Sequence, residues 1–546
     1  MPRNAQTRTL QLTFWLLVVA NVLLVWLLPV LPQQDLPQHL AYTRILRDFG
    51  DPSLPFSTRY APIDEFQAYF TSYYLMRWLS FGASVEVGMR MLMSLYVVGM
   101  FAAFAFVVRV VSPSNDSPRW SSLLVIPFIW NPPVVMGFLA YYLGLPLLLA
   151  AIGSTLGWIA RRPGPMAIGA VVASAICALL HPFLGATAFT ALVLCALVHP
   201  ERSRARRALL PALLILVLVG VGFWVGSSGL GQASSLEPEE AWRRGFGVEF
   251  IAILLGFEWS GTTSKINYSL WSMFGPFTLP VLVAVGLAAL ALAIPTRRAL
   301  REHLQEHVMP PANRALLRVA LLMVLLGWLV PFGMHRPTEL TFIDLRLLSV
   351  GWMLAACSVP SAAFASPRLR TALIVASVAF FLHLAYRLER AAGEATSLFG
   401  LLDQVDRGKV LMSLVINNDS PHLAKQFRVP HFMPMYYTVR YDGICTQFWA
   451  RYTHHLPVDY AEGQRPRQTE DWSPGNFRTA DVQDSDYVIV RAPSSQRDPE
   501  KRASTGAKVK KKLDVVATEV AREGLWVLYR VEGLPTPPEA KPTAAP

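Results

Sequence analysis

The sequence predicts an α-helical polytopic membrane protein with a small soluble α+β domain at its C-terminal end. Of its 546 residues, 53% are hydrophobic and only 16% are charged, whereas a soluble chain carries about a quarter charged residues. The charges cluster between long apolar runs, which is typical of a chain that crosses a bilayer many times. After Tyr386 the long apolar runs end, and polar residues, prolines and short β-rich runs replace them.

The first apolar run, residues 12–31, is long enough to cross a hydrocarbon core of about 30 Å as a helix. Arg3 and Arg8 precede it. A cleaved signal peptide is the competing interpretation. The run is too long for one, however, and the stretch from Pro29 to Gln33 lacks the small residues of a cleavage site. We therefore expect a retained anchor.

The segment 32–86 is too polar to span. A short amphipathic helix is expected over 36–47, ended by Gly50-Asp51-Pro52. A second, aromatic-rich helix over 65–79 is expected to lie on the bilayer surface, where tyrosine and tryptophan are favoured. A short spanning helix is the alternative for 65–79, but it would turn the later arginine-rich gaps to the outer side.

Ten further spans bring the expected total to about eleven. They are placed near residues 87–109, 120–136, 141–160, 165–181, 183–199, 208–226, 268–294, 315–332, 341–360 and 371–387. The short pair that flanks His181-Pro182 could instead be a hairpin that does not fully cross. Together with the first anchor, these spans form a transmembrane domain over residues 1–387.

The arginines are distributed on one side of this arrangement. Every arginine-rich gap falls on the same side as the N-terminus: 109–119, 161–162, 202–207, 297–318 and 368–370. This agrees with the positive-inside rule, so the net charge of +12 indicates a membrane rather than a nucleic-acid groove. The same count places on the outer side residues 32–86, 227–267, 333–340 and 388–546.

Residues 388–534 are expected to form the soluble α+β domain on the outer face. Strands are predicted at 410–416, 487–491 and 525–531, and 515–522 is either a helix or another strand. The lysine-rich stretch 497–512 is expected to be a solvated, mobile loop. The proline-containing tail 535–546 is expected to be disordered.

No metal or disulfide framework is evident. The cysteines are spread apart, three in apolar runs and one in the polar part (Cys177, Cys195, Cys357 and Cys445). His303-Leu304-Gln305-Glu306-His307 matches a zinc-peptidase pattern, but we reject it because the loop is predicted to be cytoplasmic and no third ligand stands out. His454-His455 is a weak hint of the same kind. We expect no resident cofactor, with a divalent metal left open.

The candidate site lies where the first span ends. Asp35 and His39 are one helical turn apart, so they share a face of the predicted helix. The simpler interpretation is that Asp35 caps this helix, which Pro37 helps to begin; the two interpretations are compatible. A helix start also offers N–H groups and a positive dipole end to an anion such as a phosphate.

In architecture the chain resembles the C-type (GT-C) glycosyltransferases over most of its length. It shares with them one apolar helix, a long outer loop that opens with an acidic residue, two juxtamembrane helices, about ten further spans and a soluble C-terminal domain. Two stretches look like the family's loop-1 acidic motif and its entry into the second span: Asp35-Leu36-Pro37-Gln38-His39-Leu40 and Phe81-Gly82-Ala83-Ser84-Val85-Glu86-Val87-Gly88-Met89-Arg90. The resemblance implies transfer of a sugar from a polyprenyl-phosphate donor to an outer-face glycan, lipid or protein, with Asp35 as the general base.

The chain departs from the family's pattern because Asp35 stands alone rather than in an Asp-Glu or Asp-x-Asp pair. A second acidic residue remains open, which leaves metal use open; the eligible residues are Asp51, Asp64, Glu65, Glu240 and Glu258. A leaving lipid phosphate carries charge that arginine or histidine stabilises. The substrate-binding candidates are His39, Arg44, Arg336 and Arg346, beside the further outer-side cations Arg59, Lys265 and His335.

Arg346 is the most distinctive of these cations because it sits in or near an apolar span together with Asp344. Ionisable groups are costly there and usually functional. The alternative is an ion-paired structural charge at the outer end of the span.

Two other functions stay open, a lipid or glycan transporter and a non-catalytic envelope-assembly protein. A transporter predicts paired charges or broken helices in two similar halves, and no internal duplication is visible. Arginine dominates and no lysine precedes Lys265, a compositional hint of a bacterial origin. We expect a multi-pass protein of the bacterial inner (plasma) membrane with a periplasmic C-terminal domain. Its expected partners are the bilayer, a polyprenyl-phosphate sugar and the acceptor, and not nucleic acid.

The predicted topology can be tested by thiol labelling in intact cells. A cysteine introduced at Ser53 should react with a membrane-impermeant reagent, whereas one introduced at Ser203 should react only after the cells are opened. The physical reason is the one-sided arginine distribution. The reverse labelling pattern would contradict the outer-face placement of residues 32–86.

Overall fold

The computed structural model of the chain is described over a set of separate segments: residues 3–63, 70–112, 119–160, 164–200, 202–227, 257–258, 310–330, 333–334, 342–364, 366–423, 427–448, 457–464, 474–492 and 499–532. By its internal contacts the chain divides into two units. Unit 1 contains Met1–Leu28, Glu65–Phe81 and Val87–Leu388, and unit 2 contains Pro29–Asp64, Gly82–Glu86 and Glu389–Pro546. Unit 2 therefore joins the segment after the first span to the C-terminal segment in one compact body.

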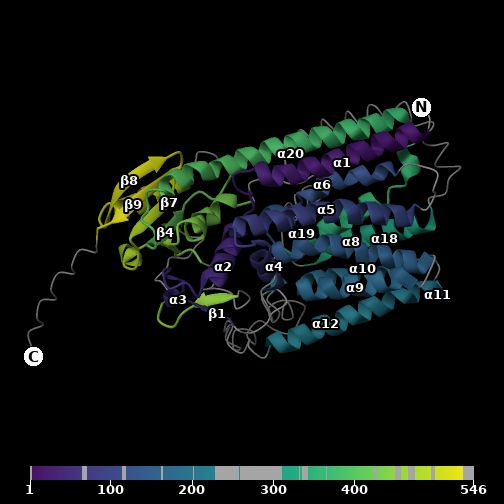
Figure 1. Cartoon of the computed structure of the whole chain (residues 1–546), viewed down its shortest axis with the longest axis horizontal. Coiled ribbons are helices and arrows are strands. Elements are labelled where there is room, and N and C mark those ends of the chain that lie inside the picture. The colour runs from purple at the N-terminus through teal and green to yellow at the C-terminus, as the bar shows by residue number, and fades with distance from the viewer. Residues whose placement is uncertain are drawn as a thin grey trace, which may run out of the picture. The chain divides into compact units, whose positions relative to one another are not determined.

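Unit 1 is a bundle of helices, most of which are apolar (Figure 1). In chain order they are α1 (Arg3–Leu27), α4 (Thr71–Leu79), α5 (Val85–Val111), α8 (Leu139–Ala160), α9 (Gly164–Leu180), α10 (Pro182–Val198), α11 (Arg202–Ala205), α12 (Leu209–Ser227), α18 (Pro311–Leu329), α19 (Ile343–Cys357) and α20 (Pro367–Leu402). Helices α8, α9 and α10 pack on one another, and α18 packs on α19. The N-terminal end of α1 and the arginine-rich α11 lie at the same end of the bundle (Figure 1).

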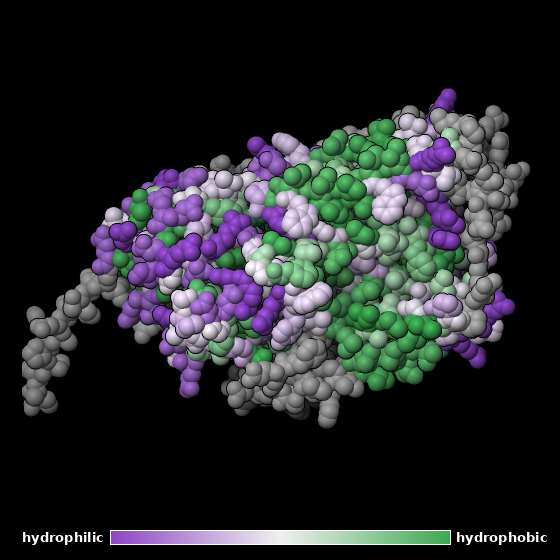
Figure 2. All heavy atoms as spheres, in the orientation of Figure 1, coloured by the Kyte–Doolittle hydropathy of each residue, from purple (hydrophilic) through white to green (hydrophobic). Residues whose placement is uncertain are grey.

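Five described helices are long and apolar enough to cross a membrane: Ala5–Leu27, Val85–Val111, Leu139–Ala160, Pro311–Leu329 and Pro367–Leu402. Large apolar side chains are exposed on them, including Leu12, Trp15 and Leu382. On the face that Figure 2 shows, hydrophobic side chains gather over the helices of unit 1, and hydrophilic ones cover unit 2. A surface of this kind is stable in lipid and not in water, so unit 1 is a multi-pass membrane unit.

Some predicted spans differ in the structure. The run predicted as one span at 120–136 is broken into three pieces, namely η2 (Trp120–Val125), α6 (Ile126–Ile129) and α7 (Pro132–Met136). Prolines at 127, 132 and 133 explain the breaks, because proline lacks an N–H and clashes with the preceding turn. Both helices that flank His181 have 17 residues. The predicted span 268–294 lies outside the described residues.

Arg90, in the first turns of α5, caps the C-terminal end of α1. Val25 is in the last turn of α1, and the residue four places on, Pro29, has no N–H to donate to its carbonyl. Arg90 supplies the missing donors: it hydrogen-bonds the carbonyl of Val25 and, at 2.7 Å, that of Leu28. A cation is also favoured at the negative end of a helix dipole. The side chain of Arg90 therefore sets the point where the chain leaves the first span.

Gly88 is needed for close packing between α5 and α4. A Cβ at Gly88 would lie 2.3 Å from the carbonyl oxygen of Met76 and 2.6 Å from Oγ of Ser80. Any larger residue would push these two helices apart. The stretch Val87 to Arg90 thus carries both a close contact and a helix cap, which accounts for its distinctive sequence.

Unit 2 contains a five-stranded sheet with the order β5-β4-β7-β9-β8. Its strands are β4 (Val410–Val415), β5 (Ile444–Cys445), β7 (Tyr487–Arg491), β8 (Ala517–Glu523) and β9 (Trp526–Val531). Strand β4 is parallel to β5 and β7, whereas β9 is antiparallel to β7 and β8. Strands β4, β7 and β9 lie where the sequence predicts strands, and the ambiguous segment 515–522 is the edge strand β8.

The prediction of a mobile loop over 497–512 is wrong. Residues Pro499–Leu513 form the helix α22. Val509 and Leu513, one turn apart, are buried in the same cluster as Met412 and Val488 of the sheet. Lys508, Lys510 and Lys511 are exposed, so their charges are solvated, whereas Lys512 is half-buried and donates to the carbonyl of Phe477. The sequence signal was hidden because only two apolar residues mark the buried face among many lysines.

Helix α20 continues to Leu402, well past the predicted span end at residue 387. Its last turns bury Ala391, Ala395 and Leu398. Glu394 on this part of α20 forms an ion pair of 2.8 Å with Arg491 at the end of β7. Arg491 is 2% exposed and also donates to the carbonyls of Asn417 and Asp419. The helix and the sheet are therefore joined by a buried cation that is hydrogen-bonded to Glu394, Asn417 and Asp419.

Replacing Glu394 with Gln should weaken this junction. The change leaves Arg491 buried without its counter-charge, which costs about 3 kcal/mol. Amide hydrogen exchange in β7 and β9 should accelerate by about 10²-fold.

The matched control is Glu519→Gln, which breaks an exposed ion pair with Arg522. An exposed pair contributes at most about 1 kcal/mol, so exchange should change little. Equal effects of the two substitutions would contradict the proposed importance of the buried pair.

Candidate active site

Helix α2 (Leu36–Asp48) is enclosed within unit 2. The predicted helix over 36–47 is thus confirmed. Its first two turns are buried on all sides, however, and not only along an apolar stripe; buried residues include the polar Gln38, His39 and Thr43. A buried polar side chain needs a hydrogen-bond partner. The partners of this helix therefore define how it is held.

Asp35 lies at the N-cap position of α2 and is 5% exposed. Its side chain makes no capping hydrogen bond, so the simpler interpretation of Asp35 as a helix cap is not borne out. Its backbone carbonyl instead accepts the N–H groups of Gln38 at 3.1 Å and His39 at 3.2 Å. Since Pro37 has no N–H, this helix start offers an anion fewer N–H groups than the sequence suggested.

Two glutamines connect this turn to the segment 427–448. The side-chain amide of Gln34 donates to Oδ1 of Asp35 at 3.1 Å, and its oxygen accepts the backbone N–H of Arg428 at 2.9 Å. One turn further along, Nε2 of Gln38 donates to the carbonyl of Gln447 at 2.5 Å. Both glutamines are buried. The Asp35 turn is thus tied at two points to a segment some 400 residues away in sequence.

His431 continues this network. It lies in η6 (Val429–Met435) and is fully buried. Its Nδ1 is 3.1 Å from Oδ1 of Asn418, and its Nε2 is 3.2 Å from Nε2 of Gln447. An amide oxygen accepts and an amide N–H donates, so Nδ1 carries the proton and Nε2 accepts. Burial, with a contribution from Arg428, lowers the pKa of His431 to about 3, which keeps the ring neutral at physiological pH.

An aromatic cluster completes the enclosure of α2. Tyr42 of α2 contacts Phe448 with ring centroids 4.4 Å apart, and Tyr60 contacts both Phe448 and Tyr460. Tyr60 and Tyr460 also face each other in a short antiparallel ladder between β1 (Tyr60–Pro62) and β6 (Val458–Tyr460). Residues from both parts of unit 2 therefore share one core.

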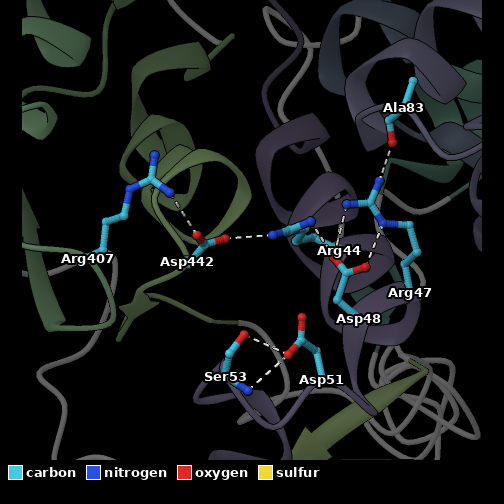
Figure 3. Close-up of polar contacts among 8 residues, drawn as sticks. All are labelled: Arg44, Arg47, Asp48, Asp51, Ser53, Ala83, Arg407 and Asp442. Atoms are coloured by element: carbon cyan, nitrogen blue, oxygen red, sulfur yellow. Dashed lines mark hydrogen bonds and ion pairs between the residues drawn. The ribbon is translucent and has the colours of Figure 1, made fainter.

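Arg44, predicted to bind substrate, faces two carboxylates (Figure 3). It pairs with Asp48 on its own helix and, at 2.6 Å, with Asp442. Asp442 follows α21 (Tyr436–Arg440), has a φ of 60° and also pairs with the exposed Arg407 at 3.3 Å. This arrangement holds the C-terminal half of α2 in place. The guanidinium of Arg44 is used in these two ion pairs.

Asp51, one of the eligible second acids, belongs to a turn (Figure 3). Its Oδ1 accepts the backbone N–H of Ser53 at 2.9 Å and the hydroxyl of Ser53 at 2.6 Å. These hydrogen bonds lower the pKa of Asp51. A carboxylate of lowered pKa is a weaker general base, which makes Asp51 a poorer candidate than its sequence position suggests.

Arg346 lies within unit 1, in the first turns of α19, and is buried among aromatic rings. Its guanidinium carbon lies 4.3 Å from the centroid of Phe138, 5.2 Å from that of Tyr141 and 5.3 Å from that of Phe183. The hydroxyl of Tyr141 donates to the backbone carbonyl of Arg346 at 3.2 Å. Asp344 accepts the N–H of Leu345 at 2.8 Å. The aromatic cage fixes the position of the cation.

Several predicted residues lie outside the described part of the chain: Arg336, Asp64, Glu65, Glu240, Lys265, His335, the 303–307 motif and His454-His455. Glu258 belongs to β2 (Phe257–Glu258), which pairs with β3 (Gly333–Met334). Arg59 donates to Gln464 at 3.2 Å. Over the described segments, no group of three or more His, Cys, Asp or Glu residues has the arrangement of a metal site.

The amide residues that hold the start of α2 were not predicted from the sequence. Gln34 and Gln38 are four residues apart and flank Asp35, and this spacing was the available signal. Gln447 and His431 could not be recognised from the sequence, because no motif or spacing relates them to α2. Their roles depend on contacts across about 400 residues of sequence.

Among solved structures, the fold of the chain is similar to that of ArnT from Cupriavidus metallidurans, whose crystal structure was determined with bound undecaprenyl phosphate. The similarity covers 97% of this chain and 100% of that chain, with a TM-score of 0.51 and 10% sequence identity. No family model and no curated protein matches the sequence. The resemblance seen in the sequence is thereby confirmed at the level of the fold.

The ion pair between Arg44 and Asp442 can be tested by Asp442→Asn. Asparagine tolerates the left-handed conformation, so the substitution removes the charge without adding backbone strain. The loss of a partly buried charged hydrogen bond should cost about 1.5–3 kcal/mol. A lower apparent melting temperature of the purified protein would report it.

Arg407→Ala provides the control, since Arg407 is 74% exposed and its pair with Asp442 should contribute less than about 1 kcal/mol. If Asp442→Asn melts at the wild-type temperature, Arg44 does not depend on this pair for its position.

Proposed function

We propose that the protein is a membrane glycosyltransferase that moves a sugar from a polyprenyl-phosphate donor to an acceptor on the outer face of the bacterial inner membrane. The acceptor is a glycan, a lipid or a protein. Similarity in fold to ArnT, which was crystallised with undecaprenyl phosphate, supports the donor class. The observation that carries the catalytic assignment is the buried Asp35 side chain, which lies at the start of α2 and is not used as a helix cap.

Asp35 serves as the general base. A sugar or lipid hydroxyl is a poor nucleophile at neutral pH, and a carboxylate within hydrogen-bond reach takes its proton as the new bond forms. The acceptor oxygen bonds to the anomeric carbon, and the bond from that carbon to the phosphate oxygen breaks. The polyprenyl phosphate leaves with the electron pair, and the acceptor proton passes to Asp35.

Cationic groups stabilise the leaving phosphate. We assign this role to Arg346, whose aromatic cage attracts the guanidinium without cancelling its charge. Arg336 has the same proposed role on the basis of sequence. His39, one turn from Asp35, orients the carboxylate or contacts the phosphate. Arg44, which faces Asp48 and Asp442, supports the site by holding α2.

The C-terminal segment has two proposed parts in this function. It encloses α2 within unit 2, as the contacts of Gln34 and Gln38 illustrate. We further propose that the domain over 388–534 lies on the periplasmic side and helps to select the acceptor. This placement follows from the arginine distribution of the sequence.

Asp35→Asn tests the catalytic assignment. Asparagine keeps the size of the side chain and one oxygen for the hydrogen bond from Gln34, but it cannot accept a proton. Transfer from a polyprenyl-phosphate sugar by the purified protein should fall by about 10²-fold or more at equal abundance. His39→Ala should lower transfer less.

Asp51→Asn is the matched control and should transfer sugar at nearly the wild-type rate, because Asp51 forms only a turn. Wild-type transfer by Asp35→Asn would rule out Asp35 as the base. A lipid transporter or an assembly protein would show no transfer with any polyprenyl-phosphate sugar even in the wild-type form.

A further inference from the structure

We propose that Gln34 is a positioning residue that aims the Asp35 carboxylate and keeps it ionised, under the control of the segment 427–448. This inference rests on the proposed role of Asp35 as the base. It adds a residue, and a dependence on the C-terminal segment, that the catalytic assignment alone does not contain.

The orientation of the Gln34 amide is fixed by its two neighbours. The backbone N–H of Arg428 is only a donor, so it must meet the oxygen of Gln34, 2.9 Å away. The amide nitrogen then necessarily points the other way, toward Oδ1 of Asp35 at 3.1 Å. The N–H of Arg428, which bonds the amide oxygen of Gln34, thus turns the amide nitrogen of Gln34 toward the carboxylate of Asp35.

This donor matters because Asp35 is 5% exposed. Burial disfavours the charged form of a carboxyl group, whereas an N–H donated to the carboxylate favours it. A general base must be ionised before it can take a proton. Gln34 therefore compensates part of the desolvation that its buried position imposes on Asp35.

The second glutamine prevents the turn from rotating away. Gln38 donates to the carbonyl of Gln447, whose side chain contacts the neutral His431, which in turn contacts Asn418. The side chains of Gln38, Gln447 and His431 are buried, and Asn418 is partly buried. Because water has little access to these groups, it is a poor substitute for the partners. The two glutamines together fix both the position of the turn and the direction of the carboxylate.

Other titratable and charged groups also lie near this turn. On α2 itself these are His39, Tyr42, Arg44, Arg47 and Asp48, and Arg428 is bonded to Gln34 through its backbone N–H. On the elements packed against it, they are His431 of η6, Arg440 of α21, which pairs with Glu86, and Asp459 of β6, which accepts the N–H of Tyr460. A shift of the acid limb is assigned to the contact between Gln34 and Asp35 only where the same change of charge at an exposed glutamine does not produce it.

Gln34→Glu is the decisive variant. One carboxylate oxygen still accepts the N–H of Arg428, but a negative charge replaces the donor to Asp35. The acid limb of the pH–rate profile should move to higher pH by about one unit or more, since a like charge disfavours ionisation. Transfer measured on the acid limb should fall about tenfold and recover as the pH is raised. Gln34→Met removes both hydrogen bonds at similar volume and should lower the maximal rate without a full recovery.

The control is Gln404→Glu, which makes the same charge change at an exposed glutamine of unit 2 in the turn after α20 and should leave the profile unchanged. Asp35→Asn is assayed in parallel. If Asp35→Asn is inactive and Gln34→Glu keeps the wild-type acid limb, the positioning role is overturned while the catalytic assignment stands. If Asp35→Asn transfers sugar normally, the catalytic assignment fails, and the role of Gln34 fails with it.

Discussion

The burial of a polar helix start is the constraint on which unit 2 depends. Gln34, Gln38 and His39 lie in the interior, and an unsatisfied buried polar group costs about 1–3 kcal/mol. The chain meets this requirement with the backbone of Arg428 and Gln447 rather than with solvent. A backbone partner cannot be removed by substituting its side chain. The contacts therefore tolerate substitution of Arg428 and Gln447 but not of Gln34 and Gln38.

The same requirement, that buried polar groups be hydrogen-bonded, applies in unit 1. There Pro29 deprives the last turn of α1 of a donor, and Arg90 replaces it. Within a bilayer the alternative partner, water, is absent from the hydrocarbon region. The two units therefore solve one problem in two ways. In unit 1 the long cationic side chain of Arg90 bonds the carbonyls at a helix end. In unit 2 the side-chain amides of Gln34 and Gln38 bond backbone groups of another segment.

The elements that could be predicted from the sequence are those with a local signal. Helix α2, the strands β4, β7 and β9, and the long apolar helices α1 and α5 all follow from periodicity, length or hydropathy. Asp35 was found because it is the first acidic residue after a span. The errors have physical reasons: α22 buries only two apolar residues, and α20 passes from an apolar to a charged sequence without a helix breaker. The contacts of Gln34 and Gln38 could not be predicted, because no sequence pattern relates these residues to Arg428 and Gln447.

The joining of distant segments in unit 2 has a consequence for the order in which the protein is made. Gln38 and its partner Gln447 are separated by 409 residues. At a synthesis rate of about 5–20 residues per second, the first glutamine is available roughly 20–80 seconds before the second. During that interval α2 has none of the contacts that enclose it in the finished protein. Contacts of such long range also close slowly, so the nascent chain carries an unfinished polar surface until synthesis is nearly complete.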